Sequence, residues 1–216
     1  VVHPQVVEVV DEHLVAQAAH MLDVHFGGGA LLAAVALVLV PEGLKSLTLL
    51  PAAVAFSSGA FVFMGLDILL ARRRTAAGQL VAMLADFLPE ALALGATAAL
   101  HRDGVALLAL IIALQNLPEG FNACRELRQS THYAASHIAG AFALTALLGP
   151  LFALTGYFLL SGSDAAVAGV MLFAAGGILY LTFQDIAPQA HLENHWAPPL
   201  GANLGFLLGI VGKLLS

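Results

Sequence analysis

The sequence predicts an all-α protein of the membrane, a polytopic helical bundle with about seven transmembrane helices. Of its 216 residues, 60% are hydrophobic and only 10% are charged, whereas soluble proteins carry about 25% charged residues. The mean hydropathy is +0.90. Seven apolar segments also follow one another, each within the range of about 17–25 residues that a helix needs to cross a bilayer.

Short polar stretches such as "ARRRTAAG", "HRDG" and "SGSD" separate these apolar segments. Any one segment alone would also suit a buried helix of a soluble protein, but seven in succession would not. Residues 27–216 are therefore expected to form one transmembrane domain. The expected spans are 27–44, 47–70, 76–100, 105–124, 136–160, 165–187 and 199–215.

Residues 1–26 have a different character. The stretch "VVEVVDEHLVAQAAHML" has helical spacing of apolar residues but also carries acids and histidines, which predicts an amphipathic segment at the membrane surface. No signal peptide pattern is visible. The formal charge of −6 gives no indication of nucleic-acid binding, and Cys124, the single cysteine, excludes an internal disulfide.

The distribution of Lys and Arg in the loops predicts the orientation. Arg72, Arg73, Arg74, Arg125 and Arg128 fall on one side, while Lys45, Arg102 and Lys213 fall on the other. By the positive-inside rule the first group is cytoplasmic. Residues 1–26 are then cytoplasmic, and the C-terminus lies outside.

A short motif that joins proline to an acid or its amide recurs along the chain: "LVPEGL" at 39–44, "FLPEAL" at 87–92, "NLPEGF" at 116–121 and "IAPQAH" at 186–191. Such repetition is common in transporter folds. Proline removes one helical hydrogen bond and kinks the helix. The carbonyls of Ala85 and Leu114 are expected to need other partners, such as a cation.

Polar side chains accompany the two central motifs. Asp86 and Glu90 are one turn apart on one predicted span, while Gln115, Asn116 and Glu119 share a face of the next. Inserting an acidic side chain at the bilayer centre costs ~2.5–3.5 kcal/mol of free energy. Several acids at this depth therefore favour a functional cation site. The structural alternative is that these groups cross-link helices, each bond contributing ~0.6 kcal/mol.

At these motifs the chain resembles the ZIP family of divalent-metal transporters, in particular its bacterial branch. "LQNLPEGFNA" and "ADFLPEALALGA" are similar to the family's fifth and fourth helices. "GGGALLAAVALVLVPEGL", "SSGAFVFMGLDILLAR" and "AAGGILYLTFQDIAPQAH" are similar to its second, third and seventh. The resemblance runs from Phe26 to the C-terminus. It implies an eight-helix bundle with a binuclear metal site, a homodimer and the bacterial inner (plasma) membrane.

The resemblance also implies the site residues and the ion. Zinc is the family's usual substrate, with manganese, iron(II) or cadmium as other choices. Gln184, His191 and Glu42 would lie at an exit or entrance. The implied metal ligands are Asp86, Glu90, Gln115, Asn116, Glu119 and Asp185.

Four positions depart from the family pattern. The fourth-helix His and Asn are Asp86 and Phe87, the sixth-helix acid is Gly149, and the seventh-helix Glu is Gln189. The family's first helix has no counterpart in this sequence. Replacing imidazole with oxygen ligands favours harder ions such as manganese.

Other polar residues have simpler expected roles. Glu42 and Asp67 lie near span ends, where solvation at the interface is expected, and Trp196 fits an interfacial anchor. Each histidine alone is expected to be a solvated surface residue, although together they could receive metal leaving the site. These are His3, His13, His20, His25, His132, His137, His191 and His195.

The sequence thus predicts a divalent metal-ion transporter and not an enzyme, since no GxGD, HExxH or Ser–His arrangement appears in the spans. Two alternatives stay open. One is a degenerate ZIP-like protein that binds metal as a sensor or partner without transporting it. The other is a proton-coupled carrier of a different solute.

Overall fold

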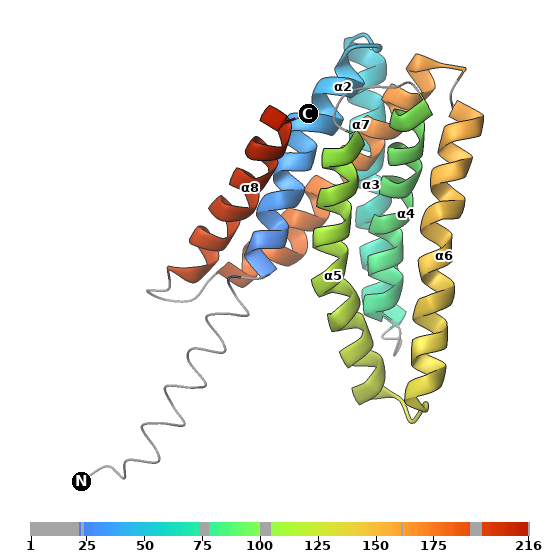
Figure 1. Cartoon of the computed structure of the whole chain (residues 1–216), viewed down its shortest axis with the longest axis vertical. Coiled ribbons are helices and arrows are strands. Elements are labelled where there is room, and N and C mark those ends of the chain that lie inside the picture. Colours follow the sequence, from blue (N-terminus) through green and yellow to red (C-terminus); the bar gives the residue numbers. More distant parts are fainter. Residues whose placement is uncertain are drawn as a thin grey trace.

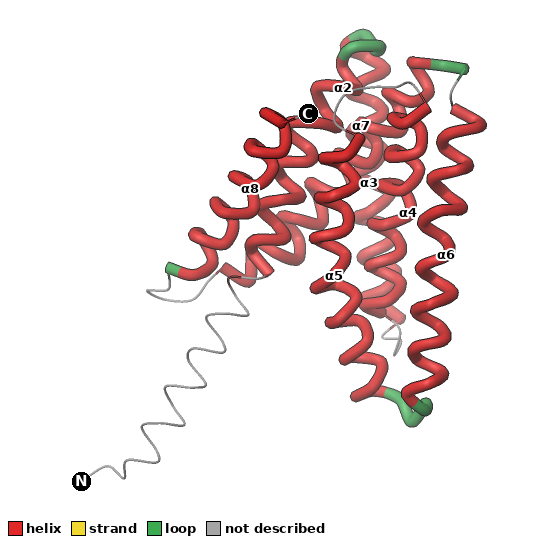
Figure 2. Tube along the Cα trace, in the orientation of Figure 1, coloured by secondary structure: helices red, strands yellow, loops and turns green. Residues whose placement is uncertain are grey.

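The computed structural model of the protein describes residues 22, 24–73, 78–99, 105–160, 162–190 and 196–215. Within these residues all regular structure is helical, and no strand occurs (Figures 1 and 2). The prediction of an all-α helical bundle is confirmed.

The helices follow one another with short connections. The first is continuous from residue 24 to residue 44, and it comprises residues 24–34, the π-helix η1 (Val35–Leu39) and α2 (Val40–Leu44). The others are α3 (Leu49–Arg73), α4 (Gly78–Ala99), α5 (Val105–Ser130), α6 (Ala135–Leu160), α7 (Asp164–Leu181), η2 (Thr182–Ile186), η3 (Ala187–Ala190) and α8 (Ala197–Leu215).

Five helices in the described part of the chain are long and apolar enough to cross a membrane: Val24–Leu44, Leu49–Leu69, Ala135–Leu160, Asp164–Gln184 and Ala197–Leu215. Their outer surfaces are apolar too, with Leu49, Leu159 and Leu215 largely exposed. A surface of this kind suits lipid rather than water. These features are those of an integral membrane protein. The helices α4 and α5, which carry the central motifs, have 22 and 26 residues.

Two helix boundaries differ from the sequence prediction. The helix α5 continues to Ser130, so "RELRQS" is helical rather than a loop, because Arg, Glu, Leu and Gln all favour the helix. The first helix includes residues 24–26, and His25 is buried within it. His25 was expected to be solvated, and that expectation is wrong.

Three pairs of helices meet through glycines that let the two backbones approach closely. The helix α3 packs against α7, α4 packs against α6, and the helix over residues 24–44 packs against α8. In the α3·α7 pair, a Cβ added to Gly59 would lie 1.9 Å from the Phe173 carbonyl oxygen. One added to Gly176 would lie 2.0 Å from the Phe56 carbonyl oxygen. The contact is therefore reciprocal.

The other two pairs repeat this geometry. A Cβ on Gly95 of α4 would lie 1.8 Å from the Ala153 oxygen, and one on Gly156 of α6 would lie 2.1 Å from the Leu92 oxygen. On each helix, the residue whose oxygen is contacted lies three positions before the glycine: Ala153 before Gly156, and Leu92 before Gly95. Small residues and Cα–H···O contacts are typical of helix packing in membranes. The third pair joins Gly29 to Ala202 and Gly205 to Phe26.

The paired helices run in the same direction, because the residue numbers of successive contacts increase along both helices. In the α3·α7 pair these contacts join Gly59 to Phe173, Phe63 to Gly177 and Asp67 to Tyr180.

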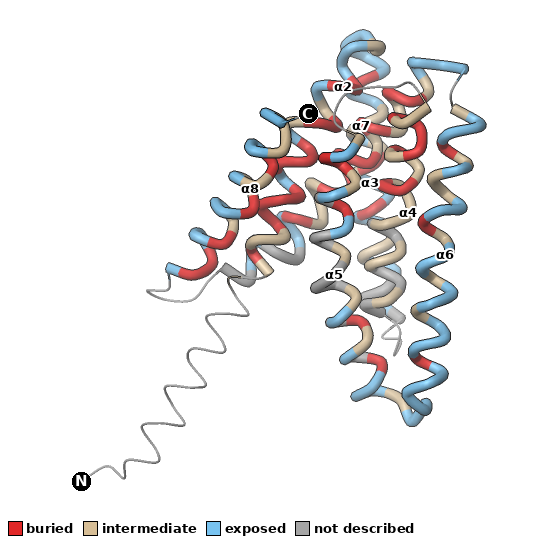
Figure 3. The backbone as a smooth tube through the Cα atoms, viewed as in Figure 1, coloured by how far each residue is buried: buried red, intermediate tan, exposed pale blue. Residues whose placement is uncertain are grey.

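The helix α5 stands apart from these three pairs. It packs mainly against α4, and Gly212 of α8 faces the side chain of Leu107 on α5 rather than its backbone. The buried core lies where α5, α4, α7 and the first helix meet (Figure 3). Its largest fully buried side chains include Leu39, Leu108, Met171 and Ile178.

The four proline motifs fall into two structural classes. In the outer two, a π-helix ends two residues before the proline: the Val40 N–H bonds the Val35 carbonyl, and the Ala187 N–H bonds the Thr182 carbonyl. This looser turn precedes Pro41 and Pro188, which cannot donate the next helical bond. In the inner two motifs, the α-helix continues through the proline position.

Candidate functional site

The two inner motifs lie on α4 and α5, which pack against each other (Figure 1). Asp86, Gln115, Glu119 and Asp185 occupy helical positions, but their side chains lie outside the described part of the chain. His191 lies outside it entirely. The described side chains of the expected set are Glu90, Asn116, Gln184 and Glu42.

Glu90 is among the most deeply buried polar side chains described, with 2% of its surface exposed. It follows Pro89 on α4 and lies one turn before Ala93, which belongs to the buried core. A buried carboxylate must be protonated, hydrogen-bonded or paired with a cation, since leaving it charged and uncompensated is very costly. Glu90 therefore has the burial expected of an intramembrane ligand.

Asn116 on α5 is partly buried, and its Nδ2 donates a 2.8 Å hydrogen bond to the Ile112 carbonyl. This bond fixes the orientation of the amide, because only the NH₂ group can donate to a carbonyl. The side-chain oxygen is then directed away from that carbonyl and keeps its acceptor capacity. Glu119 follows three residues later, on the same side of α5.

Phe87 and Gly149 are in direct contact between α4 and α6. A Cβ added to Gly149 would lie 2.4 Å from the Phe87 Cζ atom, so the ring rests on the glycine backbone. Both positions are ones at which the sequence departs from the ZIP pattern that it resembles. The phenyl ring occupies the space that any side chain at position 149 would need.

Glu42 is buried, with 3% exposed, although it lies near the end of the first helix. Its Oε1 accepts from the Lys45 Nζ, and the Lys45 side chain is 63% exposed. Gly43 explains the burial, because it packs on Leu172 and brings α2 against α7. The expectation that Glu42 is solvated is wrong.

Asp67 is tied into the bundle as well. The Tyr180 hydroxyl donates to its Oδ2 at 3.1 Å and links α7 to α3. The sequence suggested only an interfacial acid, because nothing in its spacing connects positions 113 residues apart. Gln184, in the π-helix η2, is exposed.

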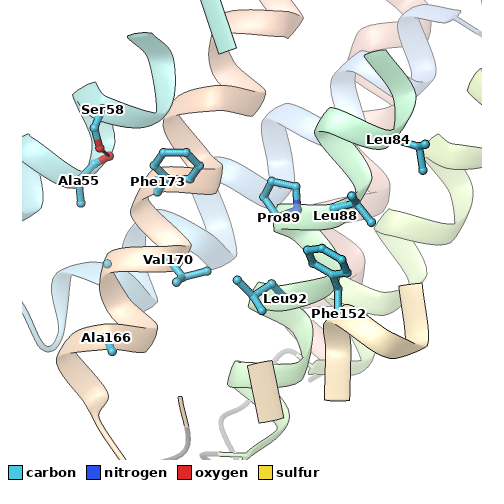
Figure 4. A pocket seen from close by; sticks show the side chains of 11 residues that line it. Ala55, Ser58, Leu84, Leu88, Pro89, Leu92, Phe152, Ala166, Val170 and Phe173 are labelled. Atoms are coloured by element: carbon cyan, nitrogen blue, oxygen red, sulfur yellow. Dashed lines mark hydrogen bonds between the residues drawn. The ribbon is translucent and has the colours of Figure 1, made fainter. Parts of the chain in front are cut away.

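A pocket of about 620 Å³ lies between the α3·α7 and α4·α6 pairs (Figure 4). Pro89, Leu92 and Phe152 line one side and Phe173 the other. The Ser58 hydroxyl donates to the Ala55 carbonyl at 2.8 Å. The pocket is apolar, so it offers no set of cation ligands.

The described residues contain no group of three or more His, Cys, Asp or Glu side chains able to hold a metal. The described part of the site therefore consists of a buried carboxylate on α4 and an oriented amide on α5. The Phe87–Gly149 contact and the Asp67–Tyr180 bond each join residues that are far apart in the sequence. No protein-family model matches the chain, and no curated protein matches it.

Proposed function

We propose that the protein is a divalent metal-ion transporter of the ZIP type, with its site between α4 and α5. The position of Glu90 carries this proposal, because it places a carboxylate that is only 2% exposed beside Pro89, on the helix that packs against α5. Asn116 and Glu119 lie on the helix packed against α4, and they add an amide and a carboxylate.

The chemistry of the expected ligands favours an ion that accepts oxygen donors. Asp86, Glu90 and Glu119 supply carboxylates, and Asn116 with Gln115 supplies amide oxygens. Such ligands suit manganese and other hard ions, while the family resemblance favours zinc. The Phe87–Gly149 contact supports a site for one ion, since an apolar ring fills the place of an additional acid.

The helix packing supports a route to alternating access. α4 and α6 are joined backbone to backbone at Gly95 and Gly156, whereas the described glycine contact of α5, with Gly212 of α8, is made by the Leu107 side chain. A relative movement of α5 against the α4·α6 pair would open the site to one side while the tight pair stays intact. Movement of one bundle against another is typical of transporters.

Uptake of radioactive zinc or manganese into proteoliposomes tests the proposal. We expect Glu90→Gln and Glu119→Gln to reduce uptake at least ~10-fold, equivalent to ~1.4 kcal/mol of lost binding. Asp164→Asn is the matched control, because Asp164 is an exposed acid in the first turn of α7. Wild-type uptake by both site variants would refute the proposed site.

The second candidate is a metal-binding sensor that does not transport. The Phe87–Gly149 contact favours it, since this packing replaces a polar position with a ring fixed between α4 and α6. The same vesicles distinguish the two functions. Metal binding that requires Glu90, without accumulation of metal inside the vesicles over time, would establish the sensor.

A further inference from the structure

A second pocket, about 450 Å³, lies between α5 and α6 and is separate from the buried Glu90. The helix α5 contributes Asn116, Gly120, Cys124 and Arg128, which recur every four residues and so share one face. Ile138 and Phe142 line the α6 side. The pocket is a groove that runs along α5 from Asn116 to its last turn.

The groove opens towards the surface that faces lipid. Phe121 at its edge is 70% exposed, and Ala139 on the α6 side is exposed as well. Twelve residues separate Asn116 from Arg128, which corresponds to about 18 Å along a helix. The groove is therefore long and mostly apolar, with one charged end.

The charged end lies where phospholipid headgroups are expected. The 26 residues of α5 span about 39 Å, longer than the ~30 Å hydrocarbon core, so its last turns extend beyond the core. Arg128 is exposed in the last turn and makes no ion pair with any side chain that the structure describes. Residues 125–137 contain Arg125, Arg128, His132 and His137 against one acid, Glu126.

This charge argues against a route for metal ions and in favour of an anion. A guanidinium at the mouth repels divalent cations, whereas its planar donors match a phosphate group. Basic pockets between transmembrane helices are typical sites for anionic lipid headgroups. The apolar walls formed by Phe121, Ile138 and Phe142 suit an acyl chain rather than a soluble phosphate ester.

We infer that this groove binds an anionic phospholipid, with its phosphate at Arg128 and one acyl chain lying along α5 towards Asn116. The inference does not depend on metal transport, because the phosphate lies at Arg128, although the far end of the groove shares Asn116 with the proposed metal site.

Cys124 provides a probe, since it is the only cysteine and lines the groove. The full chain in neutral detergent is treated with N-ethylmaleimide, with phosphatidylglycerol or phosphatidylcholine added at equal concentration. We expect phosphatidylglycerol to slow labelling about five-fold relative to phosphatidylcholine, the factor for one basic residue at an anionic surface. Each variant is compared with and without lipid, so differences in intrinsic thiol reactivity cancel.

Two variants isolate the charge. Arg128→Gln should abolish the difference between the lipids, whereas Arg125→Gln should keep it, because Arg125 has the same charge on the same helix but does not line the pocket. Equal protection by both lipids, or persistent protection in Arg128→Gln, would overturn the inference. Protection by inorganic phosphate alone would also overturn it, since the site would then bind soluble anions.

A third variant tests the groove itself. Ala139→Trp fills the lining and should remove the phosphatidylglycerol effect while helicity, measured by circular dichroism, stays unchanged. If folded Ala139→Trp keeps the full lipid effect, the acyl chain does not occupy the groove and the inference is wrong.

Discussion

At the scale of single residues, a buried acid lies close in sequence to an apolar contact between two helices. Glu90 is 2% exposed on α4, and three residues before it Phe87 lies against Gly149 of α6. The ring fits against the glycine backbone. The pair is complementary in shape, so neither residue is expected to tolerate change alone.

The first prediction tests this complementarity. Gly149→Ala should lower stability by about 1–3 kcal/mol, because its Cβ would lie 2.4 Å from the Phe87 ring in a packed interface. Phe87→Leu should restore part of the loss in the double variant. Thermal unfolding in detergent measures both. Gly140→Ala on the same helix is the control, since a Cβ there meets nothing within 4 Å.

The second prediction concerns the ion. Asp86→His should shift competition towards zinc over manganese, because imidazole prefers late transition metals and carboxylate prefers harder ions. Displacement of bound manganese by zinc measures the shift. An unchanged competition profile would mean that Asp86 does not contact the metal.

The third prediction concerns protons at the site. Neighbouring carboxylates repel one another, so at least one should be protonated without metal, and binding must release that proton. Metal affinity should therefore weaken as pH falls from about 8 to 5. Glu119→Gln should lose most of the binding and flatten the pH dependence. A titration by isothermal calorimetry decides it, and a flat wild-type profile would leave these residues as structural cross-links.

At the scale of elements, the helices associate by two different means. Three parallel pairs use reciprocal glycine–carbonyl contacts, whereas α5 meets Gly212 of α8 through the Leu107 side chain. Without a hydrophobic driving force between helices in lipid, close backbone approach supplies much of the attraction. The prolines also differ by element, since only the outer two motifs follow π-helices.

The fourth prediction compares two glycines on α3. Gly59→Ala should destabilise the protein by about 1–3 kcal/mol, because its Cβ would lie 1.9 Å from the backbone oxygen of Phe173, which cannot rotate away. Gly65→Ala should have little effect, since its Cβ would meet nothing within 4 Å. Unfolding in mixed micelles compares the two variants. Because Gly→Ala raises helix propensity at both positions, equal stability of the two variants would contradict a close backbone contact at Gly59.

At the scale of the whole molecule, the described helices form an elongated bundle with the core towards one end (Figure 3). The connection between α5 and α6 and the one between α2 and α3 lie at opposite ends of it (Figure 1). Arg125 and Lys45 lie near these two connections. Their separation allows the proposed orientation to be tested.

The fifth prediction uses single cysteines in a Cys124→Ser background. Lys45→Cys should react with a membrane-impermeant maleimide in intact cells, whereas Arg125→Cys should react only after permeabilisation, because the arginine-rich side is expected to be cytoplasmic. The opposite pattern would invert the proposed topology.

The sequence by itself determined the class of the protein and the outline of its helices. Apolar segments interrupted by short polar stretches are a local signal, because lipid requires each spanning helix to satisfy its own backbone hydrogen bonds. The same local spacing placed Glu90 and Asn116 on adjacent helices. It failed at "RELRQS", where helix propensity carries α5 beyond the apolar segment to Ser130.

Only the tertiary structure decided which helices pair and what each polar group meets. Phe87 and Gly149 are 62 positions apart, and Asp67 and Tyr180 are 113 apart. The sequence predicts an interfacial acid at Glu42, but Gly43 packs the end of this helix against α7 and Glu42 is buried. Such contacts depend on how closely two backbones approach, and that distance is set by small residues on helices far apart in the chain.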